Sequence, residues 1–378
     1  MTQQIQLRLE FQESPVADEV SAITAVVRPI LTGILYALKQ DVAREAGGYD
    51  NLKLHMLGRL RRPGSGDVGI CFEYAIHDAL ITQNAAVTER VSDALRLCRC
   101  PGSEIASILF GAEKNGALNL INAAKAQLND DSELLYGTRG RPVKLRRHID
   151  SVASAFRRPD ARDALPTSIS GLWKADLFAG HRDTDKWIGT TVKVSRSHLE
   201  GGRGLRVGIV PADEGESDSV RKDPIRNLIV CPIPYDRSFM QVFYQAWQVV
   251  VQFLTADAMV PPPASLPRPP SREVARYLED RRDYPVVEVL SALDPLSQPG
   301  LLRTEEKPVD IVETRKRITE TTTAVLAPVP SLARTPLGSP EARRTDPLTP
   351  DSRLRQGSAG PVRRRKPTPP AHDSLFSP

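Results

Sequence analysis

Four short apolar runs separated by polar turns occupy the stretch from residue 172 to residue 233. The runs are Leu172–Phe178, Trp187–Val194, Leu205–Val210 and Leu228–Ile233. Apolar runs of this length, bounded by turn-forming residues, are typical of β-strands. The connections GHRDTDK and SHLEGGRG join the first three runs, which predicts hairpin-like links and a β-meander. A sheet of these strands is therefore the expected centre of the fold.

Helical patterns lie on both sides of the strands. One runs from about Ala17 to Arg44 and is expected to be interrupted near Pro29, because proline removes a backbone donor. Residues 85–165 are largely helical in pattern, and Arg237–Asp257 predicts another helix. The expected fold class is α/β, with a mixed central β-sheet flanked by helices and a largely helical insertion over about 85–165.

Two shorter segments complete the first part of the chain. Residues Ile5–Phe11 alternate apolar and polar side chains, which predicts a half-buried strand. The segment RRPGSGDVG (Arg61–Gly69) is rich in glycine and contains a proline, so it is expected to be a loop.

The proline content changes near Met259. Of the 32 prolines, 11 lie in residues 1–257 and 21 in residues 258–378, which places a domain boundary between 257 and 258. Residues 258–327 are expected to be a proline-rich linker with a short helical segment. Residues 328–378 have few large apolar side chains and are expected to be a disordered tail, because they bury too little surface to offset their ordering entropy.

Charge and targeting signals bound the class of protein. Residues 1–257 carry 32 Lys and Arg against 31 Asp and Glu, so net charge alone does not indicate nucleic acid. The four cysteines have no metal-binding spacing. The most apolar early stretch, Ala22–Leu38, contains Arg28 and Pro29 and is too short to span a bilayer. A soluble cytoplasmic protein with no membrane partner is expected.

The first two strands bring a carboxylate and a lysine to the same place. In Trp187–Val194, alternate residues share a face, so Thr191 and Lys193 point together, opposite the aliphatic side chains. Asp176 is embedded in the apolar run before it. If the two strands pair as a hairpin, Asp176 and Lys193 end on one face of the sheet.

Glu73 is the third residue of interest, in the helical segment GICFEYAIHDALIT. It shares an apolar stripe with Ile76 and Leu80, where a carboxylate is costly unless it is paired, hydrogen-bonded or bound to metal. The alternative is a water-exposed glutamate near the start of a helix, stabilised by the helix dipole.

This set of residues resembles the PD-(D/E)XK nuclease superfamily, whose fold is that of the restriction endonucleases. The resemblance covers about residues 60–257 and is carried by Glu73 in FEYAIHDA, Asp176 in WKADLF and Lys193 in TTVKV. It implies that Glu73 and Asp176 bind Mg²⁺ or Mn²⁺ and that Lys193 is the catalytic lysine.

The chain departs from the family pattern at one position. Thr191 stands where the family has a second acid and offers the site a neutral oxygen without charge, so either the metal binds more weakly or another carboxylate substitutes. Asp183 and Asp185 in the adjoining turn are candidates, and Asp185 is the expected third metal ligand. His181 with these two aspartates could form a separate metal cluster, but a polar hairpin turn is favoured, because the spacing fits no common metal loop.

Two further groups are candidates for contact with the substrate. A basic segment follows residue 137, and its expected nucleic-acid-binding residues are Arg139, Arg141, Lys144, Arg146 and Arg147. The alternative is a solvated helix face. In the helix Arg237–Asp257 a polar stripe is expected to line a cleft, with Gln241, Gln245 and Gln248 as its residues; the alternative is a stripe facing solvent.

The resulting expectation is a metal-dependent nuclease that hydrolyses DNA, by family analogy in bacterial restriction or phage defence. The alternative is a catalytically degenerate protein on the same fold that binds nucleic acid or serves as an assembly subunit. A protein partner bound through the tail and association of identical chains are further expectations. A third interpretation is a scaffold protein whose function lies in the proline-rich tail.

Overall fold

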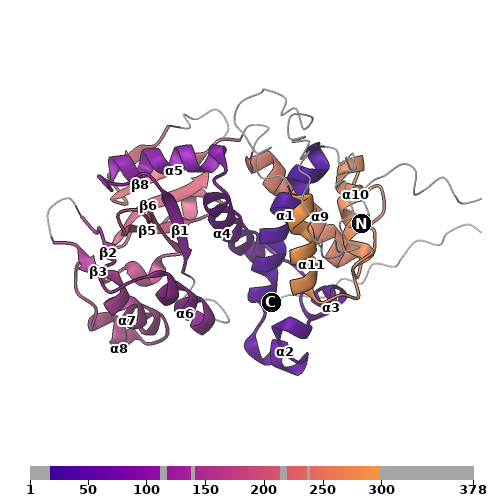
Figure 1. Ribbon diagram of the computed structural model, residues 1–378, viewed down its shortest axis with the longest axis horizontal. Helices are drawn as coiled ribbons and strands as arrows, with labels where there is room; N and C mark the ends of the chain where they lie inside the picture. The colour runs from indigo at the N-terminus through magenta and orange to yellow at the C-terminus, as the bar shows by residue number, and fades with distance from the viewer. Residues whose placement is uncertain (1–17, 111–116, 138–140, 213–218, 236–238, 298–378) are drawn as a thin grey trace, which may run out of the picture. The chain divides into compact units, whose positions relative to one another are not determined.

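The computed structural model describes residues 18–297, apart from 111–116, 138–140, 213–218 and 236–238. Within this part the chain is a mixed α/β protein in which helices flank an eight-stranded mixed sheet (Figure 1). The strand expected over residues 5–11 and the tail expected over 328–378 lie outside the described residues.

The sheet has the strand order β1-β4-β5-β6-β8-β7, and β2 pairs with both β3 and β5. The strands are β1 Ile105–Leu109, β2 Glu133–Leu134, β3 Val143–Lys144, β4 Leu177–His181, β5 Lys186–Val192, β6 Leu205–Pro211, β7 Arg221–Asp223 and β8 Leu228–Ile233. Neighbours β1, β4 and β5 are antiparallel, whereas β5, β6 and β8 are parallel. The sheet therefore changes its pairing type at β5.

The predicted meander is correct for β4 and β5 and wrong for β5 and β6. Strands β4 and β5 form an antiparallel hairpin, but β6 runs parallel to β5. The connection between them, residues 193–204, includes the 3₁₀ turn Arg196–His198 and carries the chain back to the start of the next strand. Parallel strands need a crossover of about a dozen residues, and this connection is long enough.

Two further expectations for the sheet need correction. Leu172–Lys174 forms a 3₁₀ turn, and β4 begins at Leu177, so Asp176 directly precedes the strand. The region 85–165 contributes β1, which pairs with β4 and forms one edge of the main sheet. Its sequence IASIL is short and apolar, and periodicity alone does not separate such a run from a buried helix.

The helices flank the sheet on both sides. They are α1 Asp18–Tyr36, α2 Gln40–Glu45, α3 Leu54–Leu60, α4 Ser65–Ile81, α5 Ala85–Leu97, α6 Ala117–Gln127, α7 Leu145–Arg157, α8 Pro159–Asp163, α9 Phe239–Thr255, α10 Pro269–Glu279 and α11 Val286–Leu293. Figure 1 shows α5 on one side of the sheet and α6 and α7 on the other. Alternation along β4 supplies both cores, because Leu177 and Ala179 pack into one and Phe178 into the other.

Two helix boundaries differ from the expectation. Helix α1 continues through Pro29, and the break comes instead between Tyr36 and Gln40. Helix α4 begins at Ser65, inside the segment expected to be a loop. The Asp67 carboxylate accepts the Gly64 backbone N–H at 2.7 Å, and this cap satisfies a donor at the start of the helix. The cap lets a glycine-rich segment begin a helix.

The chain does not become a linker at residue 258. Leu266, Val274, Leu278, Val286 and Val289 belong to the same hydrophobic core as α1, α4 and α9. Helices α10 and α11 pack against α1, so the described core extends past the expected boundary. Proline here begins α10 at Pro269, a position where its missing N–H is harmless.

One described helix has the length and composition to cross a membrane. The window Glu19–Tyr36 of α1 meets both criteria, and 78% of it is buried inside the protein. A core helix covered by the rest of the protein can have the same apolar composition as a membrane-spanning helix. The burial of this window is that of a core helix. The cytoplasmic location stays a prediction.

Leu278 tests whether residues 258–297 stabilise the fold. Its side chain is fully buried, so Leu278→Ala is expected to lower the free energy of unfolding by about 2–5 kcal/mol. Arg276→Ala on the exposed side of the same helix is expected to change it by about 0.5 kcal/mol or less. Urea denaturation of the full chain measures both. Equal, small effects would mean that α10 is not part of the cooperative core.

Candidate active site

Three elements bring the predicted site residues together. Asp176 directly precedes β4, Lys193 directly follows β5, and Glu73 lies in the middle of α4. The hairpin register pairs Leu177 with Thr190, so Asp176 lies opposite the residue after Thr190. Helix α4 packs against the same core as β4 and β5, which places Glu73 over the end of the hairpin.

The Asp176 carboxylate is held by three donors from β5 and the residue after it. Its Oδ2 atom accepts the Thr191 hydroxyl at 2.9 Å, the Val192 backbone N–H at 2.8 Å and the Lys193 ammonium at 2.8 Å. All three bonds end on the same oxygen, and none of them engages Oδ1. The carboxylate is therefore fixed on one side only.

Lys193 connects this carboxylate to Glu73. Its Nζ lies 2.8 Å from Asp176 Oδ2 and 3.8 Å from Glu73 Oε1. Both carboxylate side chains are 7% exposed, and the lysine is 29% exposed. Two buried carboxylates in one place are costly unless positive charge compensates them. The ammonium group supplies that charge in this structure, and its exposed fraction shows that solvent reaches the site.

The backbone of Lys193 is also held by a hydrogen bond. Its N–H donates to the Ile209 carbonyl of β6 at 3.0 Å, which extends the β5–β6 pairing by one residue. At the neighbouring strand the Phe110 N–H donates to the Asp176 carbonyl at 2.9 Å. Lys193 and Asp176 are thus held by ladder hydrogen bonds on opposite sides of the hairpin, which suits a preorganised site.

The donor set fits a magnesium ion. Mg²⁺ is usually bound through one or two carboxylates, with water and substrate phosphate oxygens completing its shell. Glu73 and Asp176 provide two carboxylates, and Oδ1 of Asp176 is not engaged by the three donors. No group of three or more His, Cys, Asp or Glu side chains suited to a metal occurs among the described residues. A metal here would depend on water and substrate for its remaining ligands.

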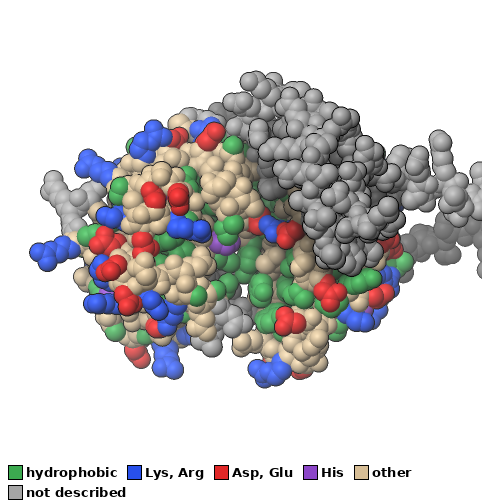
Figure 2. Space-filling model, in the orientation of Figure 1, with side chains coloured by type: hydrophobic (Ala, Val, Ile, Leu, Met, Phe, Trp, Pro, Cys, Tyr) green, Lys and Arg blue, Asp and Glu red, His purple; other side chains and the backbone are tan. Residues whose placement is uncertain are grey.

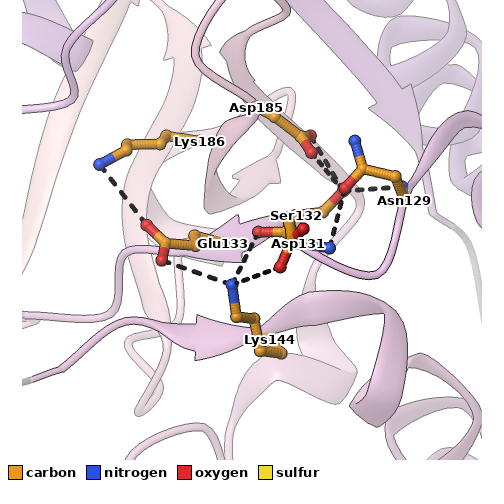
Figure 3. Close-up of polar contacts among 7 residues, drawn as sticks. All are labelled: Asn129, Asp131, Ser132, Glu133, Lys144, Asp185 and Lys186. Carbon is orange, nitrogen blue, oxygen red and sulfur yellow. Dashed lines mark hydrogen bonds and ion pairs between the residues drawn. The ribbon is translucent and has the colours of Figure 1, made fainter.

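Asp185 does not lie with the other two acids, contrary to the expectation, and Figure 3 shows it beside Ser132. It sits in the β4–β5 turn with φ +51°, and its carboxylate accepts the Ser132 hydroxyl at 2.8 and 2.9 Å and the Trp187 indole N–H at 2.7 Å. Asp176 is at the other end of the hairpin, roughly 17 Å away at about 3.3 Å per strand residue. Asp185 therefore anchors β2 to the turn.

Asp183 is also occupied within that turn. Its carboxylate accepts the backbone N–H of Ser103 at 3.0 Å and that of Glu104 at 3.3 Å. Both candidate replacements for the family's second acid thus have structural hydrogen bonds far from Lys193. The sequence alone does not fix how far a turn residue lies from the open end of its hairpin, because that distance depends on where the two strands begin and end.

A carboxylate that the sequence did not single out lies nearer to Lys193. Glu200, in the β5–β6 connection, pairs with Lys174. The pKa of Glu200 lies below its usual range, first because Lys174 donates a hydrogen bond and carries positive charge, and further because of Lys193. Its side chain is 65% exposed. The segment SHLEGGRG has only the pattern of a turn, so no signal in the sequence pointed to it.

The basic residues lie at the other end of β5 from Lys193. Lys144 pairs with Asp131 at 3.2 Å and with Glu133 at 3.7 Å, and Glu133 also pairs with Lys186 at the start of β5 (Figure 3). Arg146 lies 3.4 Å from Asp130. Arg141 and Arg147 are exposed, and Arg139 is outside the described residues. Nucleic-acid binding by this group stays a prediction, at a distance from the site.

The glutamines of α9 are not joined to the site by the hydrogen bonds of the described residues. Gln248 is exposed and its Nε2 lies 3.4 Å from the Ser265 carbonyl, while Gln241 and Gln245 are half-buried. Helix α9 packs against α1, α3, α4 and α10, and Phe243 contacts Phe72 on α4. Their role as residues lining a cleft stays a prediction.

Comparison with known proteins gives no match: no family model, curated protein or solved structure is significantly similar to this chain. The resemblance to the PD-(D/E)XK superfamily therefore rests on the site residues and the order of the elements that carry them.

Thr191 and Thr190 provide a matched test of the hydrogen bonds at Asp176. Thr191→Val removes one of three donors to a buried carboxylate and is expected to lower the free energy of unfolding by about 1 kcal/mol. Thr190→Val, on the opposite face of β5, removes only a 3.2 Å contact to the Ile188 carbonyl in its own strand and is expected to cost less. Thermal and urea unfolding measure both. Equal losses would contradict the described role of Thr191.

Proposed function

We propose that this protein is a Mg²⁺-dependent nuclease, with Mn²⁺ as a substitute, that hydrolyses phosphodiester bonds of DNA on a restriction-endonuclease-like fold. The observation that carries the proposal is the convergence of Glu73, Asp176 and Lys193 from three elements, with Nζ 2.8 Å and 3.8 Å from the two carboxylates. Buried carboxylates beside a partly exposed lysine are the groups that metal-assisted phosphodiester hydrolysis needs.

The order of the elements supports the same proposal. A helix that carries the glutamate precedes an antiparallel set of three strands, β1, β4 and β5, and the aspartate and lysine lie at one end of the β4–β5 hairpin. This matches the order of motifs on which the sequence resemblance rests. The parallel strands β6 and β8 extend the sheet beyond the site.

Each residue has a distinct part in the proposed reaction. Glu73 and Asp176 would hold the cation, and the chemistry it would supply is polarisation of the phosphoryl oxygen and a lower pKa of a bound water molecule. The ammonium of Lys193 stabilises negative charge that develops on the phosphoryl oxygens and orients the attacking water. Thr191 keeps Asp176 in place through its hydroxyl. The P–O bond to the departing oxygen breaks as the water oxygen bonds to phosphorus. The water gives up a proton to solvent and the departing oxygen takes one from solvent, which leaves a phosphate monoester and a hydroxyl group.

A second function is favoured by one observation. The site has a threonine where the superfamily has an acid, and Lys193 already compensates both carboxylates. A protein with such ion pairs is stable without a metal, so the same fold can bind nucleic acid or serve as an assembly subunit without cutting. This is the alternative that the cleavage experiment separates from the first.

Cleavage of DNA by the purified full chain tests the proposal. With Mg²⁺ or Mn²⁺, the wild type is expected to cut DNA, and Asp176→Asn and Lys193→Ala are expected to lower the rate by roughly 10²-fold or more. Asp131→Asn removes an exposed carboxylate, 94% accessible, and is expected to retain the rate. Chelation by EDTA is expected to stop all cleavage.

Circular dichroism and unfolding curves serve as the control for folding in that experiment. Equal rates in the wild type and both site variants would contradict the assignment of the site. No cleavage by the wild type, together with salt-dependent binding of DNA, would support the binding function instead.

A further inference from the structure

A cleft of about 460 Å³ lies beside the candidate active site. Its walls come from α1, α4, α6 and α11, together with the last residue of β1. Figure 2 shows hydrophobic side chains gathered around a hollow between the α6 side and the α11 side of the protein. The lining residues that matter for its chemistry are Arg28, Tyr36, Tyr74, His77, Asp78 and Asp294.

The cleft adjoins the site through two elements. On α4, Tyr74 follows Glu73 directly, and His77 lies one turn further along the same helix face. On β1, Leu109 lines the cleft, and the next residue, Phe110, donates its N–H to the Asp176 carbonyl. Glu73 is thus adjacent in sequence to a residue of the cleft wall, and Asp176 is hydrogen-bonded to the residue that follows one.

The walls combine aromatic faces with a few polar groups. The rings of Tyr36 and Tyr74 are nearly parallel, at 12°, with centroids 6.5 Å apart. Arg28 bridges Asp78 on α4 and Asp294 beside α11. The Nδ1 atom of His77 lies 2.9 Å from the buried hydroxyl of Ser107, which fixes the orientation of the ring.

The charges at this place do not suit a phosphate. One guanidinium faces two carboxylates, so an added anion would be repelled. Burial raises the pKa of Asp78 to about 6, against the opposing effect of Arg28, so the group is a carboxylate at neutral pH and accepts hydrogen bonds. Aromatic faces with donors and acceptors at the edge are what a flat, neutral heteroaromatic ring requires.

We propose that the cleft binds an unpaired nucleobase of single-stranded DNA, next to the phosphodiester that the site would cut. The inference rests on the proposed function and specifies its substrate. The volume is that of a small-ligand pocket, whereas a base inside a duplex is stacked and paired and cannot enter it. The base packs against the partly exposed ring of Tyr36, and its edge meets Arg28 and Asp78.

Two exposed positions allow the cleft to be filled without removing any core contact. Ala123 on α6 and Ser291 on α11 line the cleft and are exposed, so Ala123→Trp and Ser291→Trp would block it from opposite walls. Ala126 is exposed on the same helix as Ala123 but is not among the lining residues. Ala126→Trp is therefore the matched control.

Binding of short single-stranded oligonucleotides to the full chain, in EDTA, tests the proposal. Both blocking variants are expected to bind about five- to a hundredfold more weakly than the wild type, because stacking of one base contributes that much. Ala126→Trp is expected to bind as the wild type does. An abasic oligonucleotide of the same length is expected to bind the wild type and the blocking variants equally.

Further outcomes of the experiment separate free nucleotides from DNA as the source of the base, and the cleft proposal from the nuclease proposal. Binding of deoxynucleoside monophosphates without binding of oligonucleotides would overturn the assignment to DNA. Unchanged oligonucleotide binding in both blocking variants would overturn the cleft assignment, while cleavage that depends on Asp176 and Lys193 would still uphold the nuclease. If the blocking variants lose base-dependent binding and the wild type does not cleave DNA, the cleft assignment stands and the nuclease proposal fails.

Discussion

The ion pair between Lys193 and two buried carboxylates is the interaction on which the rest of the structure depends. Asp176 and Glu73 come from a strand end and a helix centre, and each is 7% exposed. Leaving either uncompensated would cost several kcal/mol, so the position of Lys193 ties the β4–β5 hairpin to α4. The same charge balance makes the site a candidate for a cation, since a divalent ion can take over the role of the ammonium.

The topology explains why this ion pair forms where it does. Strand β5 has an antiparallel neighbour in β4 and a parallel neighbour in β6, so its C-terminal end lies beside the ends of β6 and β8. In open α/β sheets, ligands bind outside the carboxyl ends of the strands, where the pattern of the sheet changes. The cleft lined by α4 and β1 opens next to this edge, which places the cleft and the charged site side by side.

The sequence predicted the contacts around Asp176 better than it predicted the path of the chain. Period-two alternation puts Thr191 and Lys193 on one face, and the structure places both on Asp176. Asp185 was assigned wrongly, because β4 continues to His181, three residues beyond the expected end, and so carries the turn away from Asp176. The direction of β6 and the strand character of β1 depend on partners far along the chain, which local patterns do not contain. The position of Glu200 near Lys193 and the formation of the cleft both result from tertiary packing, which local sequence patterns do not show.

Anomalous scattering from crystals soaked in Mn²⁺ tests the central claim, that Glu73 and Asp176 form a metal-binding centre, most directly. A single manganese peak is expected at oxygen-ligand distances of about 2.0–2.2 Å from Asp176 and Glu73, with the Lys193 ammonium moved off Asp176 Oδ2. The peak is expected to vanish in Asp176→Asn crystals of the same form. A soaked crystal with no manganese at these carboxylates, and with Lys193 still bridging them, would contradict the account.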